Sequence, residues 1–274
     1  MLKSASETVL ARAQGGGRTL FTRPTVGTAL RIEQFTTTTC RRISGVEPAI
    51  VLVKRGRKIA RNAGAEIVAE DGMAAVFPAG FEADIVNETD AGGAYQALSI
   101  VFSAEALAAQ PSVTPALQQI TALGVLDAGF GEAIGHAVEA ICDTALPDSI
   151  ALHRITELLV WLEHVGVRLT CPAQSDVVAQ VKQLFGAAPD APWSAPEVAG
   201  RLNMSEATLR RRLARSGTSL SRILLEARML TALTLLQAGD QSILQVSEAV
   251  GYNSPSHFAA RFRQRFGFAP STLR

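Results

Sequence analysis

Two segments near the C-terminus combine arginines with apolar residues spaced four positions apart. They are SEATLRRRLAR, residues 205–215, and SPSHFAARFRQRF, residues 254–266. Apolar residues at this spacing form one face of an α-helix, so most of the arginines must lie on the other faces. A guanidinium group donates paired hydrogen bonds to guanine or to phosphate. The chemistry that these residues offer is therefore recognition of nucleic acid.

In the first segment, Leu209 and Leu213 mark the inner face of the expected helix. A rotation of about 100° per residue places Arg211 on the outward face and Arg210 on a flank. An outward arginine near a helix start can bond guanine, whereas flanking arginines suit phosphates. The candidate DNA-binding residues here are Ala207, Thr208, Arg210, Arg211, Arg212 and Arg215.

In the second segment, three phenylalanines mark the inner face, and Pro255 fits the first helical turn without losing a hydrogen bond. Ala260 points outward and offers only close approach or contact with a thymine methyl group. We therefore expect this helix to contribute shape and positioning, with its arginines on phosphates. The candidate DNA-binding residues here are Ser254, Pro255, Ser256, His257, Ala260, Arg261, Arg263 and Gln264.

The two segments are the second halves of an internal repeat, residues 194–217 and 242–267. Each copy opens with serine followed three residues later by glutamate or glutamine, the pattern of a capping box. Each then has a short helix, a turn, a second serine cap and a closing glycine. Gly251 and Asn203 stand in the two turns, where positive φ suits them. Two short helices around a tight turn are a helix-turn-helix motif, which disfavours an ordinary bundle with solvated arginines.

Length and charge agree with a basic domain joined to an acidic one. The chain has 274 residues, which fits two domains, and a net charge of +1. From Asp176 onward there are 12 basic and 7 acidic residues, whereas the remainder has 14 basic and 18 acidic residues. The C-terminal part is thus +5 and the rest −4. This asymmetry favours a polyanionic partner at one end of the chain.

The front part changes from strands to helices. Residues 1–22 are small, polar and glycine-rich, and we expect a flexible tail. Short apolar runs at 49–56, 65–72, 73–80, 82–90 and 95–103 predict an antiparallel barrel or sandwich. After Ser103 the pattern predicts helices, the last with an apolar stripe that packs onto the barrel or onto another subunit. Residues 171–176 are expected to be a linker.

Several other chemistries find no support in the sequence. The three cysteines form no CxxC pair, so reduced thiols are expected. None of the four histidines lies in the strand-rich region, so neither a metal site nor a cofactor is expected there. No hydrolase, metalloprotease or phosphate-loop motif is present. KRGRK at 54–58 is interpreted as a solvated turn, with an acidic effector as the alternative. No signal peptide or membrane span is predicted, so we expect a cytoplasmic protein.

Residues from about Trp193 to Arg274 resemble the DNA-binding domain of the AraC/XylS family of transcriptional regulators. The matching stretches are AGRLNMSEATLRRRL, EARMLTALTLL at 226–236, VGYNSPSHFAARFRQRFG and the terminal APSTLR. The resemblance implies seven helices and two recognition helices about one DNA turn apart. Arg228 matches the linker-helix arginine. Many members carry Arg or Lys where this chain has Ala260. The positions that the resemblance places on bases are Ala207, Arg210, Arg211, Pro255, Ser256 and Ala260.

The expected fold class is α+β, with a cupin-like barrel and helices before an all-α domain of two helix-turn-helix units. We expect a tail at 1–22, a cupin-like regulatory and dimerisation domain at 23–172 and the DNA-binding domain at 173–274. The chain is predicted to be a sequence-specific transcription regulator of the activator type and not an enzyme. Its expected partners are promoter DNA, RNA polymerase, a second copy of itself, and a small-molecule or protein effector.

Overall fold

The computed structural model describes residues 20–62, 64–108, 114–171, 176–239 and 241–273. The chain divides into two compact units, unit 1 (Met1–Cys171) and unit 2 (Pro172–Arg274). Strand β1 begins at Leu20, so residues 20–22 belong to a sheet and not to the predicted tail. Residues 1–19 of that tail lie outside the described residues.

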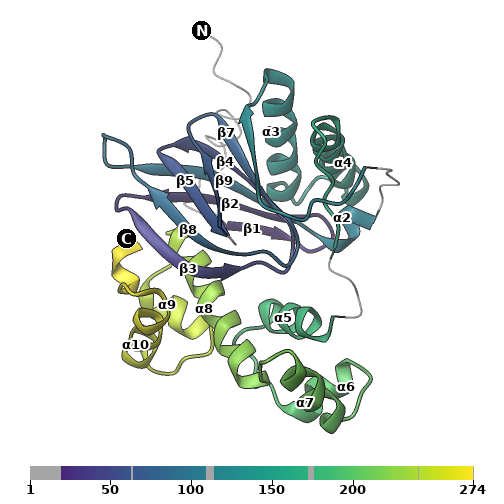
Figure 1. Ribbon diagram of the computed structural model, residues 1–274, viewed down its shortest axis with the longest axis vertical. Coiled ribbons are helices and arrows are strands. Elements are labelled where there is room, and N and C mark those ends of the chain that lie inside the picture. Colours follow the sequence, from purple (N-terminus) through teal and green to yellow (C-terminus); the bar gives the residue numbers. More distant parts are fainter. Residues whose placement is uncertain (1–19, 63, 109–113, 172–175, 240, 274) are drawn as a thin grey trace. The chain divides into compact units, whose positions relative to one another are not determined.

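Unit 1 contains two antiparallel sheets followed by helices, which confirms the α+β class (Figure 1). The six-stranded sheet has the order β1 (Leu20–Arg23), β2 (Gly27–Gln34), β9 (Tyr95–Phe102), β4 (Ala49–Arg55), β7 (Met73–Phe77), β10 (Thr121–Val125). The four-stranded sheet has the order β3 (Thr38–Ser44), β8 (Glu82–Glu88), β5 (Arg57–Asn62), β6 (Ala65–Ala69). Strand β10 falls within the stretch that the sequence pattern assigned to helices.

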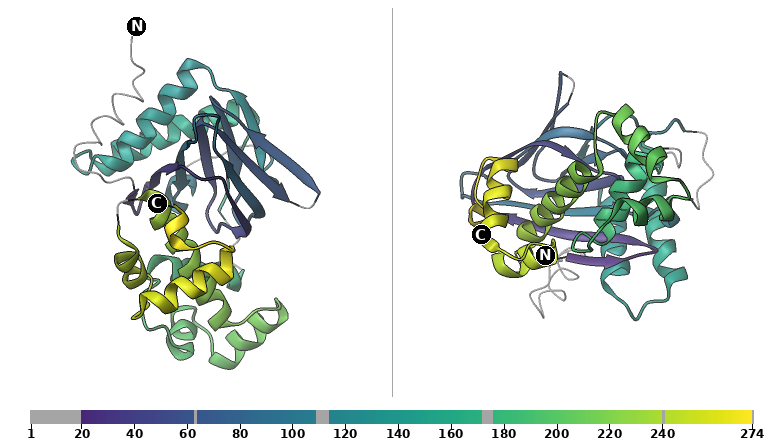
Figure 2. Two further views of the ribbon diagram at one scale, coloured as in Figure 1. Left: turned by 90° about the vertical axis from the view of Figure 1, so that its left-hand side faces the viewer. Right: turned by 90° about the horizontal axis from the view of Figure 1, so that it is seen from below.

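The six-stranded sheet is covered on both faces, which explains why β4 is apolar from Ala49 to Val53. Side chains alternate between the two faces of a strand. Ile50 and Leu52 face the helices α3 (Ala128–Cys142) and α4 (Asp148–His164), which cover the sheet in Figures 1 and 2. Val51 and Val53 therefore face the four-stranded sheet. A short helix, α2 (Ala104–Ala108), precedes β10.

The apolar stripe of α4 packs inside its own unit. Ile155, Leu158 and Leu162 are fully buried against α3 and the six-stranded sheet. The sequence left open whether this stripe would instead meet another subunit, and the structure places it in the core. Val160, on the other side of α4, and Val165, just beyond the C-terminal end of that helix, are 55% and 46% exposed.

Arg23 fastens this helical layer to the sheet. Its side chain is buried and donates to the carbonyl oxygens of Ala140 and Asp143 at 2.9 and 3.1 Å, and it also pairs with Asp148. The carbonyls at the end of α3 lack partners within the helix, and a cation there also suits the helix dipole. One side chain of β1 therefore fixes the connection between α3 and α4.

Unit 2 is helical. Its helices are α5 (Val177–Ala187), α6 (Ala195–Arg201), α7 (Glu206–Arg215), α8 (Leu220–Ala238), α9 (Ile243–Ala249), α10 (Pro255–Phe266) and the 3-10 helix η2 (Pro270–Leu273). These seven helices of the described residues match the number that the family resemblance implies. Leu209, Leu213 and Phe185 share one core cluster, while Phe258, Phe262 and Phe266 are buried on α10.

Candidate nucleic-acid interface

The two helix-turn-helix motifs, α6–α7 and α9–α10, have the same backbone hydrogen bonds in their turns. Asn203 N–H donates to Gly200 O at 3.1 Å, and Gly251 N–H donates to Glu248 O at 2.9 Å, at positions 48 residues further along. Asn203 has φ 53° and Gly251 has φ 76°, so both predicted left-handed positions are confirmed. The second turn is one residue longer, because the next cap is Ser254 and not residue 253.

Serine caps fix where both outer helices begin. Ser205 accepts from Thr208 N–H at 3.3 Å, and Ser254 accepts from His257 N–H at 3.3 Å. Of the two predicted capping boxes, the one at Ser242 is complete. At Ser194 only the serine half forms, because the Glu197 carboxylate pairs with Arg201 four residues later. The caps leave the remaining N–H groups of each first turn directed outward.

The exposed face of α7 carries the arginines that the sequence predicted. Leu209 and Leu213 are buried, whereas Arg211 and its arginine neighbours are exposed. Among the described residues these guanidinium groups form no ion pair with a carboxylate, so their donors are available to another molecule. The exposed residues of the predicted set are Ala207, Arg210, Arg211, Arg212 and Arg215, and Thr208 is half-buried.

The exposed face of α10 is less polar. Ala260 lies on it, and Arg261 donates to Gln264 at 3.2 Å across one turn of the helix. The three phenylalanines stack beneath, with ring centroids 5.8 Å apart for Phe258 and Phe262. All predicted residues of this helix are exposed, namely Ser254, Pro255, Ser256, His257, Ala260, Arg261, Arg263 and Gln264.

Arg265 does not fit the interpretation that the arginines of α10 contact phosphate. Its side chain is 19% exposed and forms a two-armed ion pair with Glu226 of α8, with Nε 2.7 Å from Oε2. A planar guanidinium group bound to both carboxylate oxygens is held in one orientation. Arg265 therefore fixes α10 against α8 and is a structural residue.

Arg228 links the connection between α5 and α6 to the second helix-turn-helix motif. It lies on α8, donates from Nε to the carbonyl of Pro189 at 2.8 Å, and stacks over the ring of Tyr252 at 5.8 Å. A Cβ at Gly251 would lie 2.7 Å from Arg228 Nη2, so only glycine permits this approach. Burial raises the pKa of Tyr252, and the positive charges of Arg228 and Arg261 partly offset this rise. The residue that the resemblance singled out on α8 thus packs against the second turn.

Comparison with known proteins agrees with this geometry. The protein-family model described as "Helix-turn-helix domain" matches residues 198–274. Unit 2 is an AraC-type helix-turn-helix domain. Transcriptional regulator SirC from Salmonella typhimurium is 46% identical over 78 residues, which are 28% of this chain and 26% of SirC. HTH-type transcriptional regulator YdeO from Escherichia coli is 34% identical over 97 residues, 35% of this chain and 38% of YdeO.

These sequence relatives extend well beyond the AraC-type domain, since the chain spans about a quarter of SirC's length. A structural likeness covers more of the chain. Wild-type ToxT from Vibrio cholerae, solved with a bound unsaturated fatty acid, has a TM-score of 0.63 at 12% identity, covering 90% of this chain and 94% of that one. At this identity the likeness shows a shared fold over that part of the chain.

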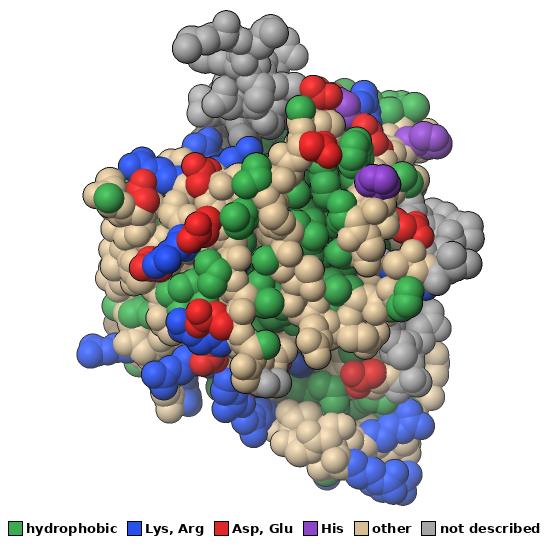
Figure 3. Space-filling model, turned by 45° about the horizontal axis from the view of Figure 1, so that its top comes forward, with side chains coloured by type: hydrophobic (Ala, Val, Ile, Leu, Met, Phe, Trp, Pro, Cys, Tyr) green, Lys and Arg blue, Asp and Glu red, His purple; other side chains and the backbone are tan. Residues whose placement is uncertain are grey.

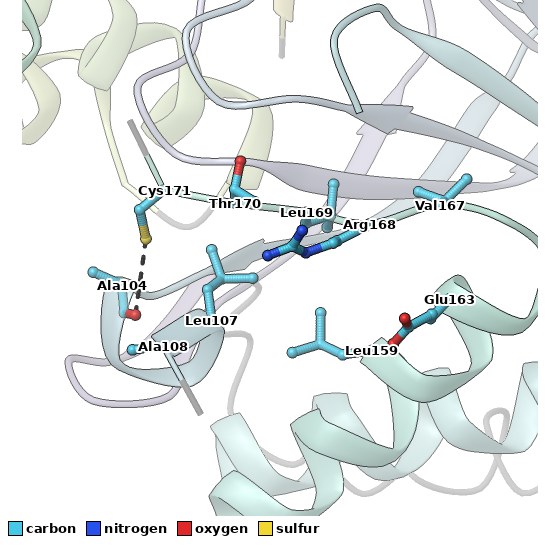
Figure 4. Close-up of a pocket in the computed structure, with 10 residues that line it drawn as sticks. All are labelled: Ala104, Leu107, Ala108, Leu159, Glu163, Val167, Arg168, Leu169, Thr170 and Cys171. Carbon is cyan, nitrogen blue, oxygen red and sulfur yellow. Dashed lines mark hydrogen bonds between the residues drawn. The ribbon is translucent and has the colours of Figure 1, made fainter. Parts of the chain in front are cut away.

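Unit 1 has a small cavity of about 160 Å³ (Figure 4). Leu107 and Leu159 line it, together with Glu163 and Arg168. Arg168 donates to the carbonyl of Thr114 at 3.0 Å, and the Thr114 hydroxyl donates to Glu163 at 3.0 Å. Ligand pockets usually measure about 300–1,000 Å³. This cavity is too small for most metabolites, and its polar side chains already have partners.

The histidines of unit 1 lie on α3 and α4, where Figure 3 shows them beside apolar side chains. His136 Nδ1 is 3.0 Å from Glu157 Oε2, and His153 and His164 are exposed. Among the described residues, no group of three or more His, Cys, Asp and Glu side chains could hold a metal ion. In the same ranges, no helix has the length and apolar character needed to cross a membrane.

The KRGRK segment differs from its predicted state as a solvated turn. Lys54 is exposed and Arg57 pairs with Glu88, but Lys58 is buried between the two sheets. Lys58 is therefore a buried residue of β5 and not part of a solvated turn. Elsewhere in unit 1, at the end of α3, burial raises the pKa of the Cys142 thiol to about 11, so that this thiol is protonated at neutral pH.

Proposed function

We propose that this chain is a sequence-specific DNA-binding transcription regulator whose unit 2 binds promoter DNA. The observation that carries this proposal is the exposed face of α7, where several solvent-facing arginines lie on a serine-capped helix of a repeated helix-turn-helix. An α-helix fits the major groove, and arginine bonds guanine bidentately there. The two motifs are proposed to enter successive major grooves about one DNA turn apart.

Base reading is assigned mainly to α7. Arg211 points outward from the second turn of the helix, and Arg210 lies beside it. Ala207 and Thr208 stand near the capped end, where close approach to base edges is possible. Arg212 and Arg215 are assigned to phosphates, which fix register without reading sequence.

The second motif is assigned to positioning. Ala260 lies where an arginine or lysine would read a base, and its methyl group suits a thymine methyl. Arg261 and Arg263 flank it and are assigned to phosphates. Ser254, Pro255, Ser256 and His257 form the exposed start of α10, whose N-terminus can accept a backbone phosphate. Gln264, which accepts a hydrogen bond from Arg261, is assigned to the same positioning role.

Unit 1 is proposed to dimerise and to sense a signal. The fold that it shares with ToxT supports this role, because ToxT structures contain an unsaturated fatty acid or a naphthalenyl butenoic acid. We propose that unit 1 responds to a small-molecule effector; the alternative is that a partner protein controls it. Activation would then follow from contact with RNA polymerase.

The DNA-binding assignment is tested with a duplex selected by the full-length protein from a random library. We expect Arg211→Ala to weaken binding to the selected duplex by about 1–3 kcal/mol, with little change on a scrambled duplex. Arg212→Ala is the matched control, because loss of a phosphate contact should weaken both duplexes alike. Equal losses from Arg211→Ala on both duplexes would remove the base contact.

Salt dependence tests the electrostatic part of the same proposal. If the protein neutralises about five phosphates, a plot of the logarithm of the association constant against the logarithm of the salt concentration should have a slope of about −4.5. Fluorescence anisotropy of a labelled duplex, recorded at salt concentrations from about 50 to about 200 mM, measures this slope. A flat plot for the wild-type protein would argue against DNA binding by unit 2.

A further inference from the structure

The connection between α5 and α6 is in contact with both helix-turn-helix motifs. It consists of residues 188–193, which we call the brace. The residue that follows it, Ser194, is the N-cap of α6, so the brace continues directly into the first motif. Pro189 and Pro192 lie within it, and each proline ring fixes its own φ angle. The brace is therefore a stiff extension of the first motif.

Trp193 holds the brace to the first motif. Its indole Nε1 donates to the carbonyl oxygen of Ala188 at 2.8 Å, which closes the brace on itself. Its ring centroid is 5.3 Å from that of Phe185 in α5, and it packs against the core cluster that contains Leu209 of α7. The guanidinium group of Arg201 on α6 lies 4.6 Å from the centroid of the indole ring. This end of the brace is thus fixed to the core of the first motif.

The middle of the brace packs against the turn of the second motif. Arg228 on α8 donates from Nε to the carbonyl oxygen of Pro189 at 2.8 Å, and its guanidinium group lies 5.8 Å from the centroid of the Tyr252 ring. A Cβ at Gly251 would lie 3.0 Å from the Cα of Asp190. The backbone of the brace and the backbone of the second turn are therefore in direct contact, with Arg228 beside both.

The brace adds a second connection between two motifs that the chain itself joins through α8. That helix ends at Ala238, and Gly239, at a φ of 78°, turns the chain toward α9. A motif attached through one short turn can change its angle to the helix, because hinges are turn residues that absorb changes in φ and ψ. Tyr252 extends the contact with the brace to α10, since its ring centroid is 5.7 Å from that of Phe258. The brace thus constrains the angle of α10.

We propose that the brace, through Trp193 and Arg228, fixes α10 relative to α7, so that both recognition helices meet one DNA duplex without rearrangement. This inference rests on the proposed function, and it makes Trp193 and Arg228 positioning residues that act through the recognition helices. Two binding elements held in the right arrangement lose less entropy on binding, and the second binds at a high effective concentration. A looser brace should therefore weaken the contribution of α10 and leave that of α7 unchanged.

The test compares two DNA duplexes with the full-length protein. One is the duplex that the protein selects, and the other is shortened to the half whose binding Arg211→Ala weakens. Arg228→Met should weaken binding to the full duplex about tenfold and change binding to the short duplex by less than about twofold. Arg222→Met is the matched control, because it removes one positive charge from an exposed position of the same helix. Equal losses on both duplexes from Arg228→Met, or no loss on either, would overturn the proposal.

Trp193→Phe tests the other end of the brace. Phenylalanine keeps a ring against Phe185 but lacks the indole N–H that closes the brace. We expect the same pattern, a loss of affinity for the full duplex alone. Because both substitutions break one connection, the double variant of Trp193→Phe and Arg228→Met should bind within about twofold of the weaker single variant. Additive losses would show that the two residues act separately and would contradict the brace.

Hydrogen exchange without DNA separates this inference from the proposed function. The amide N–H of Gly251 donates to Glu248 O at 2.9 Å and reports on the second turn. Trp193→Phe should speed its exchange about fivefold, although the change is made at the first motif. Unchanged exchange would overturn the brace even in a protein that binds DNA. Faster exchange in a protein that selects no duplex would leave the brace standing and remove the proposed function.

Discussion

Lys58 shows how a single side chain can make the stability of unit 1 depend on pH. Desolvation by burial lowers the pKa of Lys58 from 10.5 to about 8, and the nearby Cys40 opposes this shift. The same burial raises the pKa of Tyr95, so the phenol stays neutral. Asn87, which accepts from Lys58, does not titrate. Cys40 is the other titratable group that affects the pKa of Lys58 in the folded chain, through its charge.

The sign of the effect follows from proton binding. Between pH 8 and 10.5 the unfolded chain keeps the Lys58 proton while the folded chain loses it, so the free energy of unfolding rises with pH. Relative to Lys58→Met, the wild type should gain about 2 kcal/mol between about pH 7 and about pH 9.5. Urea denaturation of both proteins measures this difference. A difference that stays constant with pH would show that Lys58 titrates normally.

At the scale of elements, the two helix-turn-helix motifs share one backbone frame but differ in what supports it. The first turn uses Asn203, which is exposed and adopts the left-handed region. The second uses Gly251, over which Arg228 of α8 packs. The hydrogen bonds of the two turns match at an offset of 48 positions, from Gly200 and Asn203 to Glu248 and Gly251. The second turn is therefore the one that α8 controls.

Gly251→Ala tests that control. The added Cβ would meet Arg228 Nη2 at 2.7 Å, at a φ of 76° that alanine adopts poorly. We expect a loss of stability above about 1 kcal/mol and weaker binding to the selected duplex. Gly200→Ala is the matched control: Gly200 is helical and exposed with nothing near its added Cβ, so a gain of about 0.5–1 kcal/mol is expected. Equal effects from the two substitutions would show that neither the left-handed backbone at Gly251 nor the Arg228 contact constrains the second turn.

Local signals explain which elements the sequence could predict. Ser205, Ser254, Gly251 and Gly267 mark starts, turns and ends of helices through their own side chains or backbone freedom, so the repeat of unit 2 was predicted from sequence. The strand-to-helix order of unit 1 was also predicted. Strand β10 was not, because its five residues, TALGV, carry no alternation of apolar and polar side chains.

Partners from distant segments explain what the sequence could not predict. Arg265 has the same spacing as the exposed arginines of α10, and only Glu226, 39 positions earlier, turns it inward. Lys58 likewise follows an exposed basic run, and its burial depends on Asn87 and Gln34 from two other strands. The assignment of individual residues to bases or phosphates is a prediction from the faces of α7 and α10 on which they lie.

At the scale of the whole molecule, the division of labour follows charge. Unit 2 carries the surplus of arginines, and two of its arginines, Arg201 and Arg265, are already paired with carboxylates. The others on α7 and α10 face solvent. Unit 1 is net acidic and would be repelled by phosphates. Its surface is thus better suited to contacts with another protein than to contacts with DNA.

The proposed dimer would use the exposed side of α4. Val160 is 55% exposed and lies one turn before His164 and seven residues after His153, so the three share one face of the helix. Ile150 and Val165 near the helix ends are each 46% exposed. The opposite side of α4 is already in the core. An exposed valine on the solvent side of α4 suits pairing with a second copy of the chain.

Val160→Asp should therefore convert a dimer into a monomer in sedimentation equilibrium, because a carboxylate would be buried without a partner at the pairing face. Val125→Asp is the control, since Val125 on β10 is even more exposed, at 74%, and lies outside α4. Unchanged circular dichroism would show that both variants fold. The monomer should still bind one site of the selected duplex, but without cooperative filling of a second site. A wild-type monomer, or a dimer that survives Val160→Asp, would rule out this face as the dimer interface.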